Sequence, residues 1–395
     1  MREGWEYQKL GELVKVINGL WVGKKPPFTN VAVVRNANFT KSCTLDMSNI
    51  AYIDVEEKQF NTRELQYADI IIEKSGGSEK QPVGRPVFFN IKERGYSFSN
   101  FTATLRVVSS DIVPEYLYKV LLAQYKQGVT KRLQSKTTGL HNLDFKSYLK
   151  SVIPIPSCEK QLSIVSELDK INELIRLKKE QLKDYDNLAQ SIFYEMFGDP
   201  VINEKGWEFM KIGEIGTVER GAGISKKDFV EDGLPCIHYG QLHTILGPTT
   251  RHHHSCIPES LLPKYKIAHT NDVVMAITSE DVEGSCKSTA WLGNYDIVIG
   301  SDAAILHHEQ DGTFLSYYTM TKAFFNEKSK YAKGFKVTHI SAKEIENIPV
   351  YLPPLALQKD FAKRIEVIEQ QKENIKSTIQ DLETLLASRM QYWFD

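Results

Sequence analysis

The fold is decided by the stretch IPIPSCEKQLSIVSELDKINELI, residues 153–175, because it recurs 197 positions later as VYLPPLALQKDFAKRIEVIEQQK, residues 350–372. Proline disfavours a helix in the residue before it but fits the first helical turn, so each copy predicts a helix that starts at its prolines. The echo runs to the end of both segments without a gap, which indicates one unit written twice. The aligned pairs include Pro156 with Pro353, Gln161 with Gln358, Ile171 with Ile368, Leu188 with Leu385 and Phe197 with Phe394.

Both predicted helices carry apolar residues at alternating steps of four and three, which is the heptad spacing of a coiled coil. We expect the two helices to pair with each other in an antiparallel coiled coil. The alternative is that each helix packs only on its own domain. The residues expected to form the seam are Leu168, Ile171, Ile175 and Leu182 in the first helix and Ile365, Ile368, Ile375 and Ile379 in the second.

The first helix also carries apolar residues away from this seam, at Leu174, Leu177, Leu188, Phe193 and Phe197. One helical partner cannot bury all of them. We therefore predict a further protein surface on this helix, with Leu174 and Leu177 as contact residues.

The regions before each helix are rich in short β-branched and aromatic runs bounded by Gly, Asn and Asp, which predicts strands and turns. The two regions share an opening segment, Gly4–Leu13 and Gly206–Ile215, but otherwise align only at their final turn. We predict an α+β fold with a pseudo-two-fold internal repeat, in which two domains of mixed α/β structure are separated by two long helices. The expected domains span residues 1–157 and 199–353, and the expected helical segments span 158–198 and 354–395.

The composition is that of an ordinary soluble globular protein, with 42% hydrophobic and 25% charged residues among 395. No apolar run is long enough to span a membrane, and the first residues contain no apolar stretch of signal-peptide length. The five cysteines show no Cys-x-x-Cys spacing, which favours a reducing compartment. We therefore expect a cytoplasmic protein without a membrane partner.

The net charge of −1 hides an uneven distribution. Residues 1–157 hold 22 Lys or Arg against 15 Asp or Glu, a net charge of +7. Residues 198–353 hold 15 against 20, a net charge of −5, together with nine of the ten histidines. This balance excludes a uniformly basic protein but leaves room for a basic first domain.

No stretch carries a catalytic signature, so we expect no catalytic residues in this chain. The glycines around Gly221–Gly223 lack the third glycine of a dinucleotide-binding loop. Pro26-Pro27-Phe28 follows Lys25, whereas adenine methyltransferases carry an acidic residue or Asn there. His252–His254 with Cys256 is the one candidate metal cluster, but neighbouring residues on a strand point to opposite faces, so we expect a polar turn or a DNA-facing loop rather than a metal site. An enzyme that uses this cluster is the alternative.

A glycine-rich basic loop, residues 73–85, is the strongest candidate for nucleic-acid contact. Glycine lets the backbone approach a ligand, and Lys, Ser, Gln and Arg supply donors for phosphates and base edges. The alternative is an ordinary exposed hairpin loop. The candidate DNA-binding residues of the first domain are Lys24, Lys25, Arg35, Asn36, Lys74, Ser75, Gly76, Gly77, Lys80, Gln81, Arg85, Lys131, Arg132 and Lys136.

The corresponding stretch of the second domain, residues 278–287, is acidic. Carboxylates suit acceptance of a hydrogen bond from cytosine but do not suit phosphate binding. The candidate DNA-binding residues of the second domain are Lys226, Lys227, His238, Tyr239, Gln241, Arg251, Ser279, Lys287, Lys333 and Lys336.

The chain as a whole resembles the specificity subunit of type I restriction-modification enzymes. The resemblance rests on the repeated domain opening, the Pro and Gln residues at both helix starts, the Phe197-Gly198-Asp199-Pro200 junction and the loop from Lys74 to Arg85. It implies two target-recognition domains, each reading one half of a bipartite site in double-stranded DNA. The paired helices would set the spacing of the half-sites and dock two methyltransferase subunits.

The resemblance also implies a non-catalytic subunit that holds neither cofactor nor metal. S-adenosylmethionine, ATP and Mg²⁺ would belong to partner subunits, which would include motor-nuclease subunits for cleavage. The other interpretation of the same features is a coiled-coil adaptor with two ligand- or protein-binding domains and no DNA.

Overall fold

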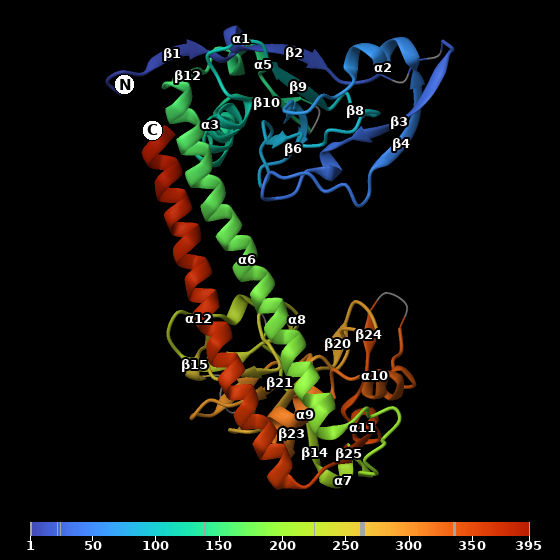
Figure 1. Ribbon diagram of the computed structural model, residues 1–395. Coiled ribbons are helices and arrows are strands. Elements are labelled where there is room, and N and C mark those ends of the chain that lie inside the picture. The colour runs from blue at the N-terminus through green and yellow to red at the C-terminus, as the bar shows by residue number, and fades with distance from the viewer. Residues whose placement is uncertain are drawn as a thin grey trace. The chain divides into compact units, whose positions relative to one another are not determined.

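The computed structural model describes residues 2–21, 23, 25–137, 140–224, 226–260, 265–334 and 337–394, with the backbone alone at 136 and 137. The chain forms two compact units, Met1–Lys178 with Thr378–Asp395 and Lys179–Ser377. Each unit contains one mixed α/β domain and part of each long helix (Figure 1). Among the described residues, none of the helices combines the length and the hydrophobicity that a membrane span requires.

The first domain is built on two small sheets. One has the order β2-β9-β5-β7 with antiparallel neighbours, and the other has the order β4-β3-β8, in which β3 and β8 run parallel. The run Ile70-Ile71-Ile72 is apolar without alternation because β5 is buried along its whole length. The strands are β2 (Val14–Asn18), β3 (Phe28–Val34), β4 (Ala51–Glu56), β5 (Ile70–Glu73), β7 (Pro86–Phe88), β8 (Tyr96–Phe98) and β9 (Thr102–Val107).

Shorter elements complete this domain. β1 (Glu6–Lys9) pairs with β12 (Val152–Ile155), and a separate sheet has the order β10-β11-β6. The remaining elements are β6 (Ser75–Gly77), β10 (Gln134–Thr137), β11 (Leu140–Leu143), α1 (Leu10–Leu13), η1 (Asn36–Asn38), α2 (Glu57–Arg63), α3 (Pro114–Lys126), α4 (Val129–Arg132) and α5 (Phe145–Tyr148).

The second domain repeats this framework. Its sheets have the orders β14-β23-β19-β21-β16 and β17-β15-β22-β18, and the parallel β15–β22 pair corresponds to β3–β8. β16 also runs parallel to its neighbour β21. Seven strands of each domain thus follow the same order, four in one sheet and three in the other, and β16 and β18 are additions in the second domain. The strands are β14 (Gly216–Arg220), β15 (Leu234–Ile237), β16 (Thr249–Thr250), β17 (Ser255–Ile257), β18 (Lys266–Ala268), β19 (Val273–Ala276), β21 (Ser288–Trp291), β22 (Ile297–Ile299) and β23 (Ala303–His308).

The second domain also has a pair of short strands in place of the three-stranded β10-β11-β6 sheet. β20 (Thr278–Ser279) pairs antiparallel with β24 (Thr338–His339), and β13 (Glu208–Lys211) pairs with β25 (Pro349–Leu352). The remaining elements are α7 (Ile212–Ile215), η2 (Lys226–Asp228), α8 (Tyr239–Thr244), α9 (Gly312–Tyr318), α10 (Lys322–Ser329) and α11 (Ala342–Glu346).

The two long helices are α6 (Cys158–Phe197) and α12 (Leu355–Phe394), with 40 residues each. In the first unit the start of α6 lies beside the end of α12, where Arg389 donates to Glu167 at 3.2 Å. In the second unit the end of α6 lies beside the start of α12, where Lys372 lies 2.8 Å from Asp186. The helices therefore run antiparallel, which confirms the predicted fold class.

The apolar seam between the helices is buried. Lys372, at a break in this seam, is also buried, and its ammonium group binds Glu369 as well as Asp186. Of the predicted seam residues, Leu182 is partly buried. The fully buried ones are Leu168, Ile171, Ile175, Ile365, Ile368, Ile375 and Ile379.

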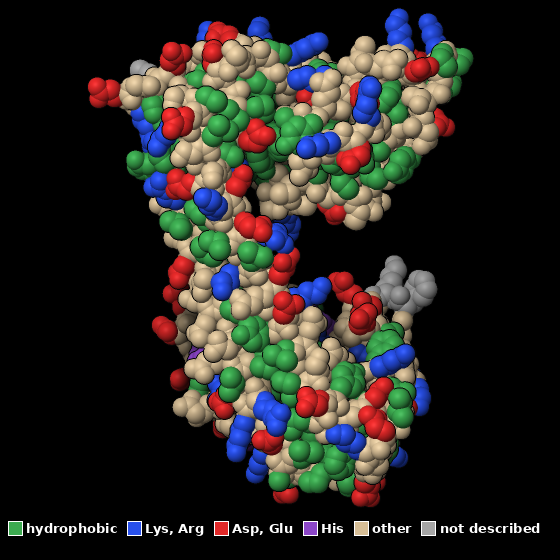
Figure 2. All heavy atoms as spheres, in the orientation of Figure 1, with side chains coloured by type: hydrophobic (Ala, Val, Ile, Leu, Met, Phe, Trp, Pro, Cys, Tyr) green, Lys and Arg blue, Asp and Glu red, His purple; other side chains and the backbone are tan. Residues whose placement is uncertain are grey.

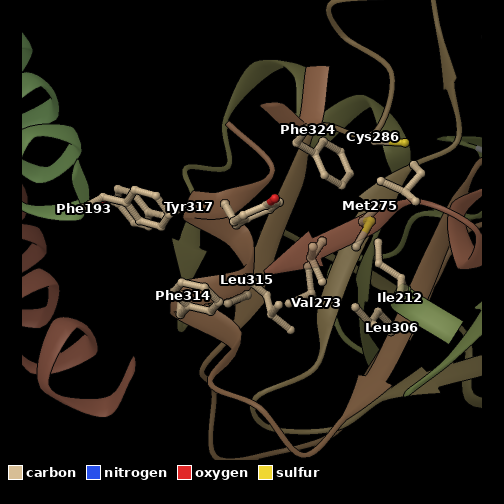
Figure 3. Packing of buried hydrophobic residues seen from close by; sticks show 14 of the residues in the cluster. Phe193, Ile212, Val273, Met275, Cys286, Leu306, Phe314, Leu315, Tyr317 and Phe324 are labelled. Atoms are coloured by element: carbon tan, nitrogen blue, oxygen red, sulfur yellow. The ribbon is translucent and has the colours of Figure 1, made fainter. Parts of the chain in front are cut away.

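One sequence-based expectation about α6 is wrong. Phe193 and Phe197 do not face a further protein, because both lie in the core of the second unit. Figure 3 shows Phe193 pointing from α6 toward α9, and its ring stacks on Phe314 with centroids 5.8 Å apart. Leu174, Leu177 and Leu188 remain exposed by nearly half. Heptad spacing describes only the helical partner, whereas here the domain itself covers a second face of the helix.

A buried glutamine joins each domain to its helix. In the first unit, Gln161 accepts from the backbone N–H of Val113 at 2.8 Å and donates to the carbonyls of Asp111 and Pro156. In the second unit, Gln358 accepts from the N–H of Asp311 at 3.0 Å and donates to the Pro353 carbonyl. These two glutamines are the pair that the repeat aligns, so the repeat preserves the joint between domain and helix.

Candidate nucleic-acid interfaces

In the first domain the structure gathers several of the predicted contact residues around β6. This strand pairs with β11, which pairs with β10, so the glycine-rich loop lies beside a segment about 60 residues later in the chain. Thr130 of α4 lies against Gly84, where an added Cβ would stand 2.6 Å from the Thr130 side chain. The neighbouring Lys131 and Arg132 are exposed beside this loop.

Asn36 fixes the tip of β6. Its side-chain amide donates to the Ser75 carbonyl at 2.6 Å, and the Ser75 hydroxyl binds the Asn142 side chain at 2.6 Å. Gly76 has φ +100, and a Cβ there would stand 3.0 Å from the Asn36 amide nitrogen. Glycine is therefore required at this position, and the exposed backbone at Gly76 stays open to close approach by a ligand.

Lys74 is half-buried at the base of the same loop. Its ammonium group donates to Asn18 at 2.8 Å, and burial lowers the pKa of Lys74. Its backbone N–H and that of Ser75 both donate to the Phe101 carbonyl. Lys74 therefore contributes to the internal contacts of the loop, and only part of its surface is available to a ligand.

Arg85, predicted as a DNA contact, is enclosed by the protein. Its guanidinium donates to Glu73 at 3.1 Å and to the carbonyls of Phe39, Thr40 and Asn36. Only 4% of Arg85 and 1% of Glu73 are exposed. Burial raises the pKa of Glu73, although the Arg85 charge opposes this. In this structure Arg85 organises the loop and presents no free donor outward.

Other predicted residues of the first domain divide into two groups. Lys25 and Lys80 are exposed, so their charges are available to phosphates. Arg35 and Asn36 are partly buried, and the Arg35 Nε and Asn36 Oδ1 atoms have no hydrogen-bond partner among the described residues. Gln81 is partly buried and Gly77 is buried against Val83. The predictions at Lys24 and Lys336, and at the Lys136 side chain, lie outside the described residues.

In the second domain the acidic loop 278–287 continues from β20. His243 binds the Thr278 carbonyl at 3.1 Å, and the Thr278 hydroxyl lies 3.3 Å from His339. Lys287 is exposed and reaches the His243 carbonyl at 3.2 Å, whereas Ser279 is buried. Histidines from α8 and β24 therefore surround the start of this loop. Sequence reasoning missed both, because they come from segments far from the loop.

Several predicted contacts of the second domain have structural partners instead. The His238 side chain accepts a hydrogen bond from the N–H of Gly240, and the backbone N–H of His238 donates to the Gln241 side chain at 2.8 Å. The two residues therefore cap the start of α8, and both are buried. Arg251 binds Glu366 of α12 at 2.7 Å.

The remaining candidates keep an outward position. Tyr239 is partly buried between His238 and His243, and Lys226 and Lys227 are exposed on η2. Lys333 is exposed but lies 2.5 Å from Glu344. The hydrogen bond to Lys333 lowers the pKa of Glu344 to about 2, so this carboxylate stays ionised and competes with any phosphate for Lys333.

The residues of the histidine cluster lie in different surroundings. His253 binds the Tyr295 hydroxyl at 2.7 Å, and Cys256 is buried on β17. In the part of the chain that the structure describes, no group of three His, Cys, Asp or Glu residues is arranged to hold a metal ion. The surface seen in Figure 2 mixes Lys and Arg with Asp and Glu over both units, so the charge difference between the domains is not concentrated in one patch on that face.

Comparison with known proteins gives one consistent family. A family model described as "Type I restriction modification DNA specificity domain" matches residues 2–184 and 204–384. The type I restriction enzyme MjaVIII specificity subunit of Methanocaldococcus jannaschii is 23% identical, over 97% of this chain and 92% of that protein.

Solved structures share the fold. A chain from a structure described as "Structural basis underlying complex assembly and conformational transition of the type I R-M system" has a TM-score of 0.59 at 17% identity, covering 100% of this chain and 98% of that one. The type I restriction-modification S subunit from M. genitalium has a TM-score of 0.53 at 12% identity, covering 99% and 96%.

Proposed function

The chain belongs to the family of type I restriction-modification DNA specificity domains, and we propose that it is the DNA-specificity subunit of a type I restriction-modification complex. Each domain reads one half of a bipartite site in double-stranded DNA. The observation that carries the proposal is that two domains with one strand order present unlike loops at the same place, after β5 and after β19.

The long helices suit the role of a spacer and a dock. A helix of 40 residues measures about 60 Å at 1.5 Å per residue, and paired helices are stiff. Duplex DNA makes the distance between two readers matter, because half-sites recur with the helical turn. The exposed side chains of Leu174 and Leu177, 47% and 46% accessible, support docking of methyltransferase subunits on α6.

In this proposal the chain itself does not catalyse. Methyltransferase subunits, two of them, bring S-adenosylmethionine, and motor-nuclease subunits bring ATP and Mg²⁺. A target adenine leaves the base stack to enter the methyltransferase site, so this chain needs to bind and position the duplex rather than to react with it. The complex acts on DNA in the cytoplasm.

Mapping of methylated adenines in cells with and without this chain tests the proposal. We expect methylation at one bipartite sequence, with two specified halves and an unspecified spacer, to vanish when the chain is deleted and to return on complementation. An unchanged methylation pattern would sink the proposal. It would favour the alternative of a coiled-coil adaptor that binds no DNA, for which the family and its relatives offer no support.

A further inference from the structure

We propose that two buried cations, Arg85 in the first domain and Lys328 in the second, are positioning residues that hold the two DNA-reading loops in their binding conformation. The loops are residues 73–85 and 278–287. This inference rests on the proposed function and names the internal supports on which half-site reading depends.

Lys328 supports the acidic loop from beneath. It lies on α10 with 4% of its surface exposed, and its ammonium group donates to the Glu283 carbonyl at 2.8 Å. It also donates to the Ser285 carbonyl. Both carbonyls belong to the turn of the loop, about 40 residues earlier in the chain, so this contact ties the turn to α10.

The turn has few other long-range supports. Gly284 donates to the Asp281 carboxylate at 2.7 Å, and the Ser285 hydroxyl donates to the Val282 carbonyl at 2.7 Å. Both contacts are local. The backbone returns to β19 at Cys286, whose N–H donates to the Ala276 carbonyl at 2.8 Å, and Lys328 ties the turn before it to α10.

The charge of Lys328 also matters for DNA. The exposed side of the loop carries Glu280, Asp281 and Glu283, which repel phosphates. A cation directly beneath the loop offsets part of this field. Burial lowers the pKa of Lys328, whereas the nearby Cys286, Glu283 and Asp281 act in the opposite direction and favour the charged ammonium group.

Arg85 holds the corresponding loop of the first domain in position. It binds Glu73 at the start of the loop and the Phe39 carbonyl at 2.9 Å, which brings the η1 segment against the loop. That segment carries Asn36, whose amide holds the Ser75 carbonyl at 2.6 Å. Arg85 therefore acts on the tip of β6 through Asn36, without an exposed donor of its own.

The two supports come from different elements and share no sequence signal. Arg85 ends its own loop, whereas Lys328 comes from a helix late in the domain. Each belongs to one domain only. Loss of either support is therefore expected to blur one half of the bipartite target and to leave the other half intact.

The test selects duplexes from a random library with the full-length chain and sequences what is retained. We expect Lys328→Met to reduce discrimination by roughly 10-fold at one or more positions of one half-site, since an altered contact costs about as much as a mismatched base pair. Arg85→Met should do the same in the other half. Matched controls are Lys330→Met, at the C-cap of the same helix, and Arg94→Met in the first domain, both exposed and paired with a single carboxylate.

Amide hydrogen exchange adds a readout on the loop itself. In Lys328→Met, exchange in residues 280–287 should rise at least about 10-fold while β19 keeps its protection. Lys328→Gln retains a donor without the charge and should give an intermediate loss in the same half-site. Unchanged selection by the Met variants, equal blurring of both halves, or loss of the whole fold in both Lys328 variants overturns the positioning role. Absence of any retained motif for the unmodified chain would instead overturn the proposed function.

Discussion

The two domains share a strand framework and differ in what they attach to it. In the first, the loop after β5 is glycine-rich, basic and backed by the three-stranded β10-β11-β6 sheet. In the second, the loop after β19 is acidic, backed by the two-stranded β20–β24 pair and surrounded by histidines. The framework needs only buried strands in a fixed order, so the attached surface is free to diverge.

The two helices also differ in their exposed residues, although the repeat aligns their positions one to one. The exposed Leu174 and Leu177 of α6 correspond to Gln371 and Asn374 of α12. The proposed docking surface is therefore not duplicated, even though the helices are alike in length and seam.

The largest effect should come from Leu174→Asp combined with Leu177→Asp, which should abolish co-purification of the methyltransferase subunits. Carboxylates at these positions put charge into an apolar contact, but both side chains are already half-exposed, so thermal unfolding should stay unchanged. The control is Gln371→Asp with Asn374→Asp, which should retain the partners. Equal loss in both pairs would show that the helices dock partners symmetrically.

Phe193→Ala should destabilise the second unit by about 3–5 kcal/mol, because it leaves a cavity among the rings of Phe314, Phe361 and Phe197. Denaturant unfolding measures this. Leu188→Ala, at an exposed site on the same helix, serves as the control and should cost little. A small effect at Phe193 would mean that α6 does not belong to this core.

Acid should weaken the second unit more than the first. Burial lowers the pKa of His308 to about 4, below its ordinary value of 6.5, so the unfolded chain binds the proton more readily than the folded one. This contribution to stability is present above pH 6.5 and is lost, by up to about 3 kcal/mol, as the pH falls toward 4. Thermal unfolding at pH 7 and pH 4.5 measures this, and His308→Gln should flatten the dependence. A slope that survives the substitution would assign it to other groups.

The smallest effect concerns the salt dependence of DNA binding. Replacing the exposed Lys80, Lys131 and Arg132 by Gln should reduce the slope of log K against log salt by up to about 3, since each phosphate contact contributes roughly one unit. Replacing Lys226 and Lys227 should reduce it by less, because the second domain is net acidic. Titration of one labelled duplex across salt concentrations compares the two variants, and equal reductions would contradict the charge asymmetry.

Sequence patterns predicted the helices because residues that are buried at regular intervals along a helix appear as regularly spaced apolar residues in the sequence. They could not predict that Phe193 and Phe197 lie in a domain core, because heptad spacing describes only the contact with the partner helix. They also did not reveal the common strand order, because corresponding strands of three to seven residues share their burial but not their residue identities. The loop of residues 73–85 was predicted as a contact region, yet its most obvious donor, Arg85, points inward. The sequence shows that a donor such as Arg85 is present but not where its side chain points. No sequence pattern indicated that Lys328 contacts the loop.

The glutamine joint has a consequence for how such chains change over generations. Gln161 and Gln358 hold their domains chiefly through backbone N–H and carbonyl groups, which every sequence supplies. A domain exchanged by recombination at the helix boundary therefore brings the correct attachment with it, whatever its side chains. Such a protein can acquire a new DNA-recognition domain in one genetic event, while the helices that its partners must recognise stay the same.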